Sequence, residues 1–269
     1  MKLFDNHNHS NFSPDSHVAI EDIAAAATKK GLSGIAITDH YDVDAPRKED
    51  EFIFNPAEQQ QEIDRVQAIT PITLLKGIEV GLQPKSLEKI KNFTNQYKFD
   101  TVIASIHFVD GTDPYYGSYY IGKTAKEAFS RTLEVMYETA VTYKDFDILG
   151  HYDYVVRYAP YPNDQRNITL KNYGEYFEPL LKFLAENGKT MEVNTKTYIK
   201  HNGHTPTLDL NILKRFKELG GEAISLGSDS HDLQRQGENF NTYIPLIKSC
   251  GFKYLVYYKE RKPQYYKID

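Results

Sequence analysis

The chain has 269 residues, of which 40% are hydrophobic, and a formal net charge of −5 at pH 7. This length suits a single domain with a large core, and the acidic balance argues against a nucleic-acid-binding face. The single cysteine excludes a disulfide framework and a thiolate metal cluster. No apolar run reaches the roughly eighteen residues of a membrane span, and no signal-peptide pattern opens the chain. We therefore expect a cytoplasmic protein without a membrane partner.

Seven short runs of apolar and β-branched residues are typical of buried strands. In chain order they lie at residues 2–4, 34–38, 73–78, 101–106, 146–150, 190–193 and 223–227. Nearly every run is followed within a residue or two by a histidine, an aspartate or a glutamate. An eighth, trailing strand is expected at residues 254–258, with the rest of the C-terminal stretch an edge segment and solvated tail.

Helical patterns separate these strands, at residues 20–30, 56–68, 85–97, 124–143, 170–187 and 208–219, with a short last helix at 242–249. Asn55 and Pro56 are typical of an N-cap followed by the first helical position. Pro179 predicts a bend or restart within its helix, because proline cannot donate the i→i−4 hydrogen bond.

Strand–helix alternation predicts a parallel sheet with right-handed crossovers. Seven units with polar groups at the carboxyl ends of the strands favour a closed β/α barrel, formed by residues 1–269 as one domain. The alternative is an open, doubly wound sheet, which would gather its functional residues at one crevice rather than from all strands.

The opening segment has two histidines that are separated by one residue. Asp5, His7 and His9 alternate at the end of the first predicted strand, so their side chains can converge on one point. Paired neutral imidazoles are ligands of first-row metals. An isolated pair of this kind can also arise by structural chance, so its weight depends on whether similar residues recur along the chain.

Further candidate ligands recur at the other predicted strand ends. Six of the nine histidines lie there. They are His7, His9, His40, His107, His151 and His231. Glu79 follows a buried apolar run, where a carboxylate needs a partner or a metal. Asp229 and His231 repeat the i, i+2 spacing of His7 and His9. Because a catalytic site uses about three protein ligands per ion, this set indicates two or three divalent metal ions.

The ordered motifs resemble the polymerase-and-histidinol-phosphatase superfamily, known as PHP. The resemblance runs from residue 3 to about residue 231 and rests on motifs that end at His9, His40, Glu79, His107, Asp153 and His231. It implies a distorted seven-stranded (β/α)7 barrel with a trinuclear metal site. One ion would be held by His7, His9, Glu79 and Asp229, a second by Glu79, His107 and His151, and a third by His40, His231 and Asp15. Zinc is the first choice, and iron or manganese also suits these ligands.

The resemblance also implies a mechanism for hydrolysis of a phosphate ester. Two metals that are bridged by Glu79 would share a water, lower its pKa and present hydroxide for in-line attack on phosphorus. Glu79, Asp229 and His231 are the predicted catalytic residues. Asp5 and Asp153 are expected to orient ligand imidazoles rather than to bind metal.

Within the superfamily the chain resembles the stand-alone histidinol-phosphate phosphatases of bacterial histidine biosynthesis. This resemblance implies hydrolysis of L-histidinol phosphate. Arg157 is expected to clamp the phosphate, unless it forms a surface ion pair with a helix carboxylate. Lys196 and Lys200 are further candidates for the same task, and His17 is expected either to meet substrate or to be solvent-exposed. Recognition of the imidazole and amine would use an acidic group, for which Asp42, Asp44 and Asp110 are candidates.

Two other functions stay open. One is a PHP-type phosphoesterase or exonuclease that acts on a nucleotide or another small phosphate ester. The other is an inactive, metal-bound barrel that serves as an interaction module. A full set of candidate ligands argues against the inactive barrel, and the absence of a basic groove favours a small monoester over a nucleic acid.

Overall fold

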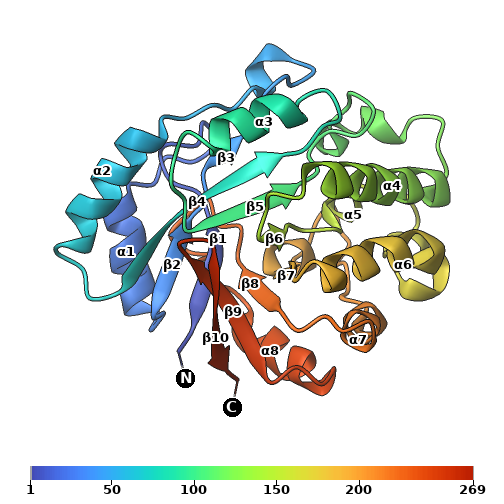
Figure 1. Cartoon of the computed structure of the whole chain (residues 1–269). Helices are drawn as coiled ribbons and strands as arrows, with labels where there is room; N and C mark the ends of the chain where they lie inside the picture. The colour runs from blue at the N-terminus through green and yellow to red at the C-terminus, as the bar shows by residue number, and fades with distance from the viewer. Residues whose placement is uncertain (1, 269) are drawn as a thin grey trace.

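A parallel sheet curls into a nearly closed barrel in the computed structural model, which describes residues 2–268 (Figure 1). Seven of its eight strands lie side by side in the order β1-β2-β4-β5-β6-β7-β8. They are β1 (Phe4–Asn8), β2 (Gly34–Ile37), β4 (Thr73–Gly81), β5 (Thr101–Ser105), β6 (Ile148–Leu149), β7 (Thr190–Asn194) and β8 (Ile224–Gly227). The two edge strands meet where the Asn8 and Ser230 backbones bridge and His9 N donates to Ser230 O at 2.9 Å. The predicted α/β barrel is confirmed, and the open sheet is wrong.

Helices cover the outside of this sheet (Figure 1). The predicted ones are present as α1 (Ile20–Lys29), α2 (Pro56–Gln67), α3 (Leu87–Thr94), α4 (Ala125–Tyr143), α6 (Leu170–Glu186), α7 (Leu210–Glu218) and α8 (Phe240–Ser249). The core lies between helices and sheet, where Phe129 of α4 and Phe177 of α6 are fully buried. The Asn55 cap is confirmed, since its side chain accepts a hydrogen bond from Ala57 N at 3.0 Å. Within residues 2–268, no helix has both the length and the apolar character to cross a bilayer.

Short helical segments shape the loops at the barrel mouth and were not predicted. They are α5 (Tyr154–Arg157) and the 3-10 turns η1 (Lys48–Asp50), η2 (Pro114–Tyr116), η3 (Ser118–Tyr120), η4 (Asn163–Gln165) and η5 (Thr195–Tyr198). The bend expected at Pro179 is wrong in position, because the non-helical residue of α6 is Tyr173, with φ −130° and ψ 15°. A proline ring conflicts with the carbonyl four residues earlier, here that of Glu175, so Pro179 alone does not explain the distortion at Tyr173.

Two further strands were not predicted. β3 (His40–Tyr41) lies beside β4, with His40 paired to Glu79. β10 (Lys262–Lys267) pairs antiparallel with the expected β9 (Tyr254–Lys259). The expected edge segment is therefore present and largely exposed, but it is a paired strand and not a free tail. The connecting Glu260 and Arg261 have φ of 52° and 61°, as a tight hairpin turn requires.

The β9–β10 hairpin closes the amino end of the barrel. Val256 of β9 packs against Ile103 and Ile148 of the sheet, and the Tyr257 ring stacks on Phe4 with centroids 3.7 Å apart. Figure 1 shows the hairpin in front of the first strands, close to both chain termini. Because this end is filled, only the carboxyl ends of the strands are left to form an open mouth, as in other β/α barrels.

Candidate metal centre and cavity

One buried carboxylate lies at the centre of the barrel mouth. Glu79 of β4 is fully buried, and five imidazoles from four strand ends lie within 3.4 Å of its oxygens. Oε2 lies 3.2 Å from His7 Nε2, 3.4 Å from His9 Nε2 and 3.0 Å from His40 Nδ1. Oε1 lies 3.2 Å from His107 Nε2 and 2.8 Å from His151 Nε2. The structure therefore brings these six predicted ligands to one place.

Several polar atoms in this cluster are buried without a hydrogen bond. They are His7 Nε2, His9 Nε2, His40 Nδ1, His151 Nδ1 and Glu79 Oε2. Such atoms are costly to leave unsatisfied, and imidazole nitrogens with carboxylate oxygens are suitable ligands for divalent first-row metals. Four groups of three residues present ligand atoms within 4.8 Å of one another. The groups are His9, His40 and His231; His7, Glu79 and His151; His7, His9 and Asp229; and His40, Asp42 and His107. The donor set fits metal ions.

The pKa shifts in this cluster also indicate a site that needs positive charge. Burial lowers the pKa of His107, but the charges of Asp42 and Glu79 outweigh it and raise this pKa to about 10. Burial raises the pKa of Glu79, yet the nearby His7 and His107 imidazoles hold it well below its usual range. So many buried carboxylates require positive charge, which either protons or metal cations can supply.

Asp229 follows β8 at a sharp turn. Its φ of 50° lies in the left-handed region, which aspartate adopts more readily than most residues. Oδ1 lies 3.5 Å from His9 Nε2 and 3.2 Å from Lys196 Nζ, and Oδ2 lies 3.0 Å from Arg157 Nη1. The backbone turn at Asp229 differs from the extended backbone expected at His7 and His9, but the two side chains still converge, with His231 Nδ1 3.6 Å from Asp229 Oδ1.

Asp15 lies at the edge of the cluster. Its Oδ2 is 3.0 Å from His231 Nε2 and 3.5 Å from His40 Nε2, so it joins the two imidazoles with which it was predicted to share an ion. His17, two residues along, is exposed and does not line the cavity. The geometry thus favours Asp15 over His17 in this position.

Two carboxylates to which the sequence analysis gave no metal-site role hold ligand imidazoles. Glu192 of β7 places Oε1 2.8 Å from His7 Nδ1, and its Oε2 accepts a hydrogen bond from His151 N at 2.8 Å. Asp42 places Oδ1 2.8 Å from His107 Nδ1. Such contacts fix the ring orientation of a metal ligand. Glu192 lies in a buried apolar strand, so the reasoning that singled out Glu79 could also have found it.

The predicted orienting carboxylates contact other groups. Asp5 accepts hydrogen bonds from Ser228 N at 2.9 Å and Gly237 N at 2.8 Å, so it fixes the backbone just before Asp229. Asp153 accepts one from Thr197 Oγ1 at 3.0 Å. Within residues 2–268, no hydrogen bond or ion pair joins either carboxylate to an imidazole ring.

Glycine at two strand ends leaves space for the carboxylates that hold these imidazoles. A Cβ on Gly227 would lie 2.1 Å from Glu192 Oε1, and one on Gly81 would lie 1.8 Å from Asp42 Oδ1. Neither approach is sterically possible, because real Cβ atoms do not come so close to other heavy atoms. The glycines are therefore part of the site although they carry no functional group.

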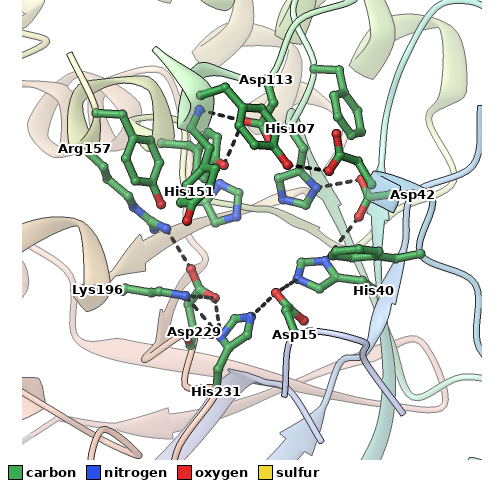
Figure 2. Close-up of a pocket in the computed structure, with 17 residues that line it drawn as sticks. Asp15, His40, Asp42, His107, Asp113, His151, Arg157, Lys196, Asp229 and His231 are labelled. Carbon is green, nitrogen blue, oxygen red and sulfur yellow. Dashed lines mark hydrogen bonds and ion pairs between the residues drawn. The ribbon is translucent and has the colours of Figure 1, made fainter. Parts of the chain in front are cut away.

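A cavity of about 430 Å³ opens above the cluster. Figure 2 shows Arg157 and Lys196 reaching Asp229, and Asp113 at the opposite end of the view. Lys200 is exposed and does not line the cavity. The structure therefore brings two of the four predicted substrate-binding residues to the cavity and leaves out His17 and Lys200. Aromatic side chains form much of the remaining wall, including Phe52, Phe108, Tyr115, Tyr116, Tyr154 and Tyr158.

Comparison with known proteins agrees with this geometry. Residues 5–196 match the family model described as PHP domain. A Lactococcus lactis protein named histidinol-phosphatase is 32% identical over 97% of this chain and 96% of its own length. A Clostridium acetobutylicum protein named probable histidinol-phosphatase is 33% identical over 98% and 99%.

A solved structure extends the likeness to three dimensions. The L. lactis histidinol phosphate phosphatase, in complex with zinc, L-histidinol and phosphate, has a TM-score of 0.89 and 31% identity. The match covers 98% of this chain and 99% of that one. The resemblance inferred from the sequence motifs is thereby confirmed. The chain belongs to the PHP family, the polymerase and histidinol phosphatase superfamily.

Proposed function

We propose that this chain is a metal-dependent phosphomonoesterase that hydrolyses L-histidinol phosphate to L-histidinol and phosphate, as a cytoplasmic, single-domain enzyme of histidine biosynthesis. This proposal rests mainly on the cluster of imidazoles and carboxylates around Glu79 at the barrel mouth. Full-length similarity to an L. lactis enzyme solved with zinc, L-histidinol and phosphate supports the choice of substrate.

Two or three divalent ions would be held at the mouth, with zinc as the first choice. The distances support the ligand sets expected from the family. They are His7, His9, Glu79 and Asp229; Glu79, His107 and His151; and Asp15, His40 and His231. When bound, such ions stabilise charge on phosphoryl oxygens and lower the pKa of water.

The protein's own groups would orient and neutralise the phosphate. Lys196 Nζ lies 3.2 Å from Asp229 Oδ1 and 3.1 Å from His231 Nδ1 and lines the cavity, so its ammonium can donate to a phosphoryl oxygen beside them. Arg157 is almost fully buried, and its guanidinium holds Asp229 in place. Glu79, Asp229 and His231 are the residues that we propose to be essential for turnover.

The shape and charge of the cavity disfavour a nucleic acid. Its outer wall includes Asp50 and Asp113, and the loop at residues 46–51 carries mixed charges. Acidic groups at a cavity mouth repel a polyanion and attract cations. A small ester with a positive charge of its own fits better than an oligonucleotide.

Phosphate release from L-histidinol phosphate tests the proposal directly. We expect kcat/KM for this ester to exceed that for p-nitrophenyl phosphate or a nucleoside monophosphate by about a thousandfold, or about 4 kcal/mol of transition-state discrimination. The same sample should contain two to three metal ions per chain and should not degrade a short single-stranded DNA. Bound metal with activity concentrated on another ester would reject the proposed substrate but retain the metal site.

Removal of the metal should destabilise the fold, because the ligands come from the first, last and intermediate strands of the barrel. An ion present at about a thousand times its dissociation constant contributes about 4 kcal/mol. For a chain of this size, that loss lowers the melting temperature by roughly 10 °C. Calorimetry before and after dialysis against a chelator measures the change, and added zinc should restore it. An unchanged melting temperature in metal-free protein would contradict ligation by these strands.

A further inference from the structure

One aspartate in the cavity wall differs from the others in its partners. Five aspartates line the cavity. Four have a basic side chain within 4 Å: Asp15 (His231), Asp42 (His107), Asp50 (Arg47) and Asp229 (Arg157 and Lys196). Asp113 has no lysine, arginine or histidine within that distance among residues 2–268.

Asp113 is nevertheless held firmly in place. It caps η2, where Oδ1 accepts a hydrogen bond from Tyr115 N at 2.8 Å, and the same oxygen accepts one from the Tyr154 hydroxyl at 3.0 Å. Burial raises the pKa of Asp113, while the bond from Tyr115 N lowers it. Burial of a carboxylate without a cationic partner costs free energy. A cation that binds beside Asp113 would offset this cost.

The position of Asp113 suits a substrate with opposite charges at its two ends. The Tyr154 ring centroid lies 5.3 Å from Arg157 Cζ, and the Tyr154 hydroxyl reaches Asp113. One tyrosine side chain therefore spans the wall from the cations around Asp229, where the phosphate would bind, to this carboxylate. Phe52 and Tyr115 line the same cavity and offer aromatic faces to a flat ring.

We propose that Asp113 determines substrate specificity by binding a cationic N–H group in the organic half of the phosphate ester. This proposal rests on the proposed function, and it deepens it. In L-histidinol phosphate, either the ammonium or the protonated imidazole supplies that group. The candidates for this task from the sequence were Asp42, Asp44 and Asp110. Asp42 is engaged with His107, and the other two form ion pairs with Lys89 and Arg131 outside the cavity.

Asp113→Asn is the appropriate variant, because asparagine keeps the capping oxygen and removes only the charge. We expect kcat/KM for L-histidinol phosphate to fall by about 10- to 100-fold, as for the loss of a charged hydrogen bond. The fall should lie mainly in KM. Hydrolysis of p-nitrophenyl phosphate, which has no cationic group, should change by less than about threefold, and metal content should stay unchanged.

Asp110→Asn is the matched control, since Asp110 lies in the same loop but pairs with Arg131 at the surface. It should leave both substrates unaffected. Ethanolamine phosphate and an imidazolyl-alkyl phosphate without an amine distinguish the two possible cations. A loss confined to the ester that carries the amine or to the one that carries the imidazole identifies the group that Asp113 binds.

An equal loss on p-nitrophenyl phosphate, or an unchanged KM for L-histidinol phosphate, would overturn the role of Asp113. Failure of the proposed function would give a different result, because wild-type protein would then show no preference for L-histidinol phosphate over p-nitrophenyl phosphate. The two proposals can thus be rejected independently of each other.

Discussion

Replacement of Glu79 by glutamine should abolish hydrolysis. The amide keeps the size of the side chain but removes the negative charge that five imidazoles surround within 3.4 Å. A ligand shared between two proposed metal sites is lost, so bound metal should fall to one ion per chain or fewer. We expect turnover to decrease by at least about a thousandfold, or about 4 kcal/mol. Phosphate release and elemental analysis of the same sample measure both effects.

Glu192→Gln is the matched control, because Glu192 is also fully buried and contacts His7 through the other ring nitrogen. It orients the ring without facing the cluster centre, so its loss should cost about 10- to 100-fold in metal affinity or activity. Glu79→Gln must be the more severe of the two. A Glu79→Gln protein that retains all its metal and a tenth of its activity would remove Glu79 from the centre of the site.

Arg157→Met should lower both stability and turnover. The guanidinium is 1% exposed and donates to Asp229 Oδ2 at 3.0 Å, Asn194 Oδ1 at 3.0 Å and Thr197 Oγ1 at 3.1 Å. Removal of one partner of a buried ion pair costs about 3–5 kcal/mol, which corresponds to a melting temperature lower by roughly 10 °C. Asp229 would also lose the hydrogen bond from Arg157 that fixes its orientation, so kcat should fall.

Lys196→Met provides the comparison, since Lys196 contacts the same carboxylate but its side chain is 22% exposed. We expect it to raise KM for L-histidinol phosphate with little change in melting temperature. The two cations would then have separate tasks, one in holding Asp229 and the other in binding phosphate. If Arg157→Met raises KM alone and leaves the melting temperature unchanged, Arg157 clamps phosphate instead.

Much of the metal centre could be predicted from the sequence, because the carboxyl ends of all parallel strands lie at the same end of a barrel. Once His107 and His151 are assigned to the ends of parallel strands, the fold itself brings them to the same mouth. Their distances of 3.2 and 2.8 Å from Glu79 agree with that rule. The start of α2 could also be predicted, because Asn55 and Pro56 are a local signal for a helix N-terminus.

The remaining features depend on contacts between distant segments, which a local pattern does not specify. Arg157 has the same sequence context whether it faces solvent or Asp229, 72 residues away. The role of Glu192 depends on the neighbouring strands, which bring His7 and His151 to its two oxygens. The β10 strand was missed because its polar sequence, with a lysine at each end and a proline near its start, is typical of an exposed segment until β9 pairs with it.

The seam of the barrel has a consequence for synthesis of the chain. β1 and β8 meet at the Asn8–Ser230 bridge, and the proposed metal site takes His7 and His9 from one side of that seam and Asp229 from the other. A nascent chain therefore carries its first two ligands from the start but cannot complete their site until Asp229 has left the ribosome. We therefore expect the ion at this one site to bind late, to chains whose barrel has already closed.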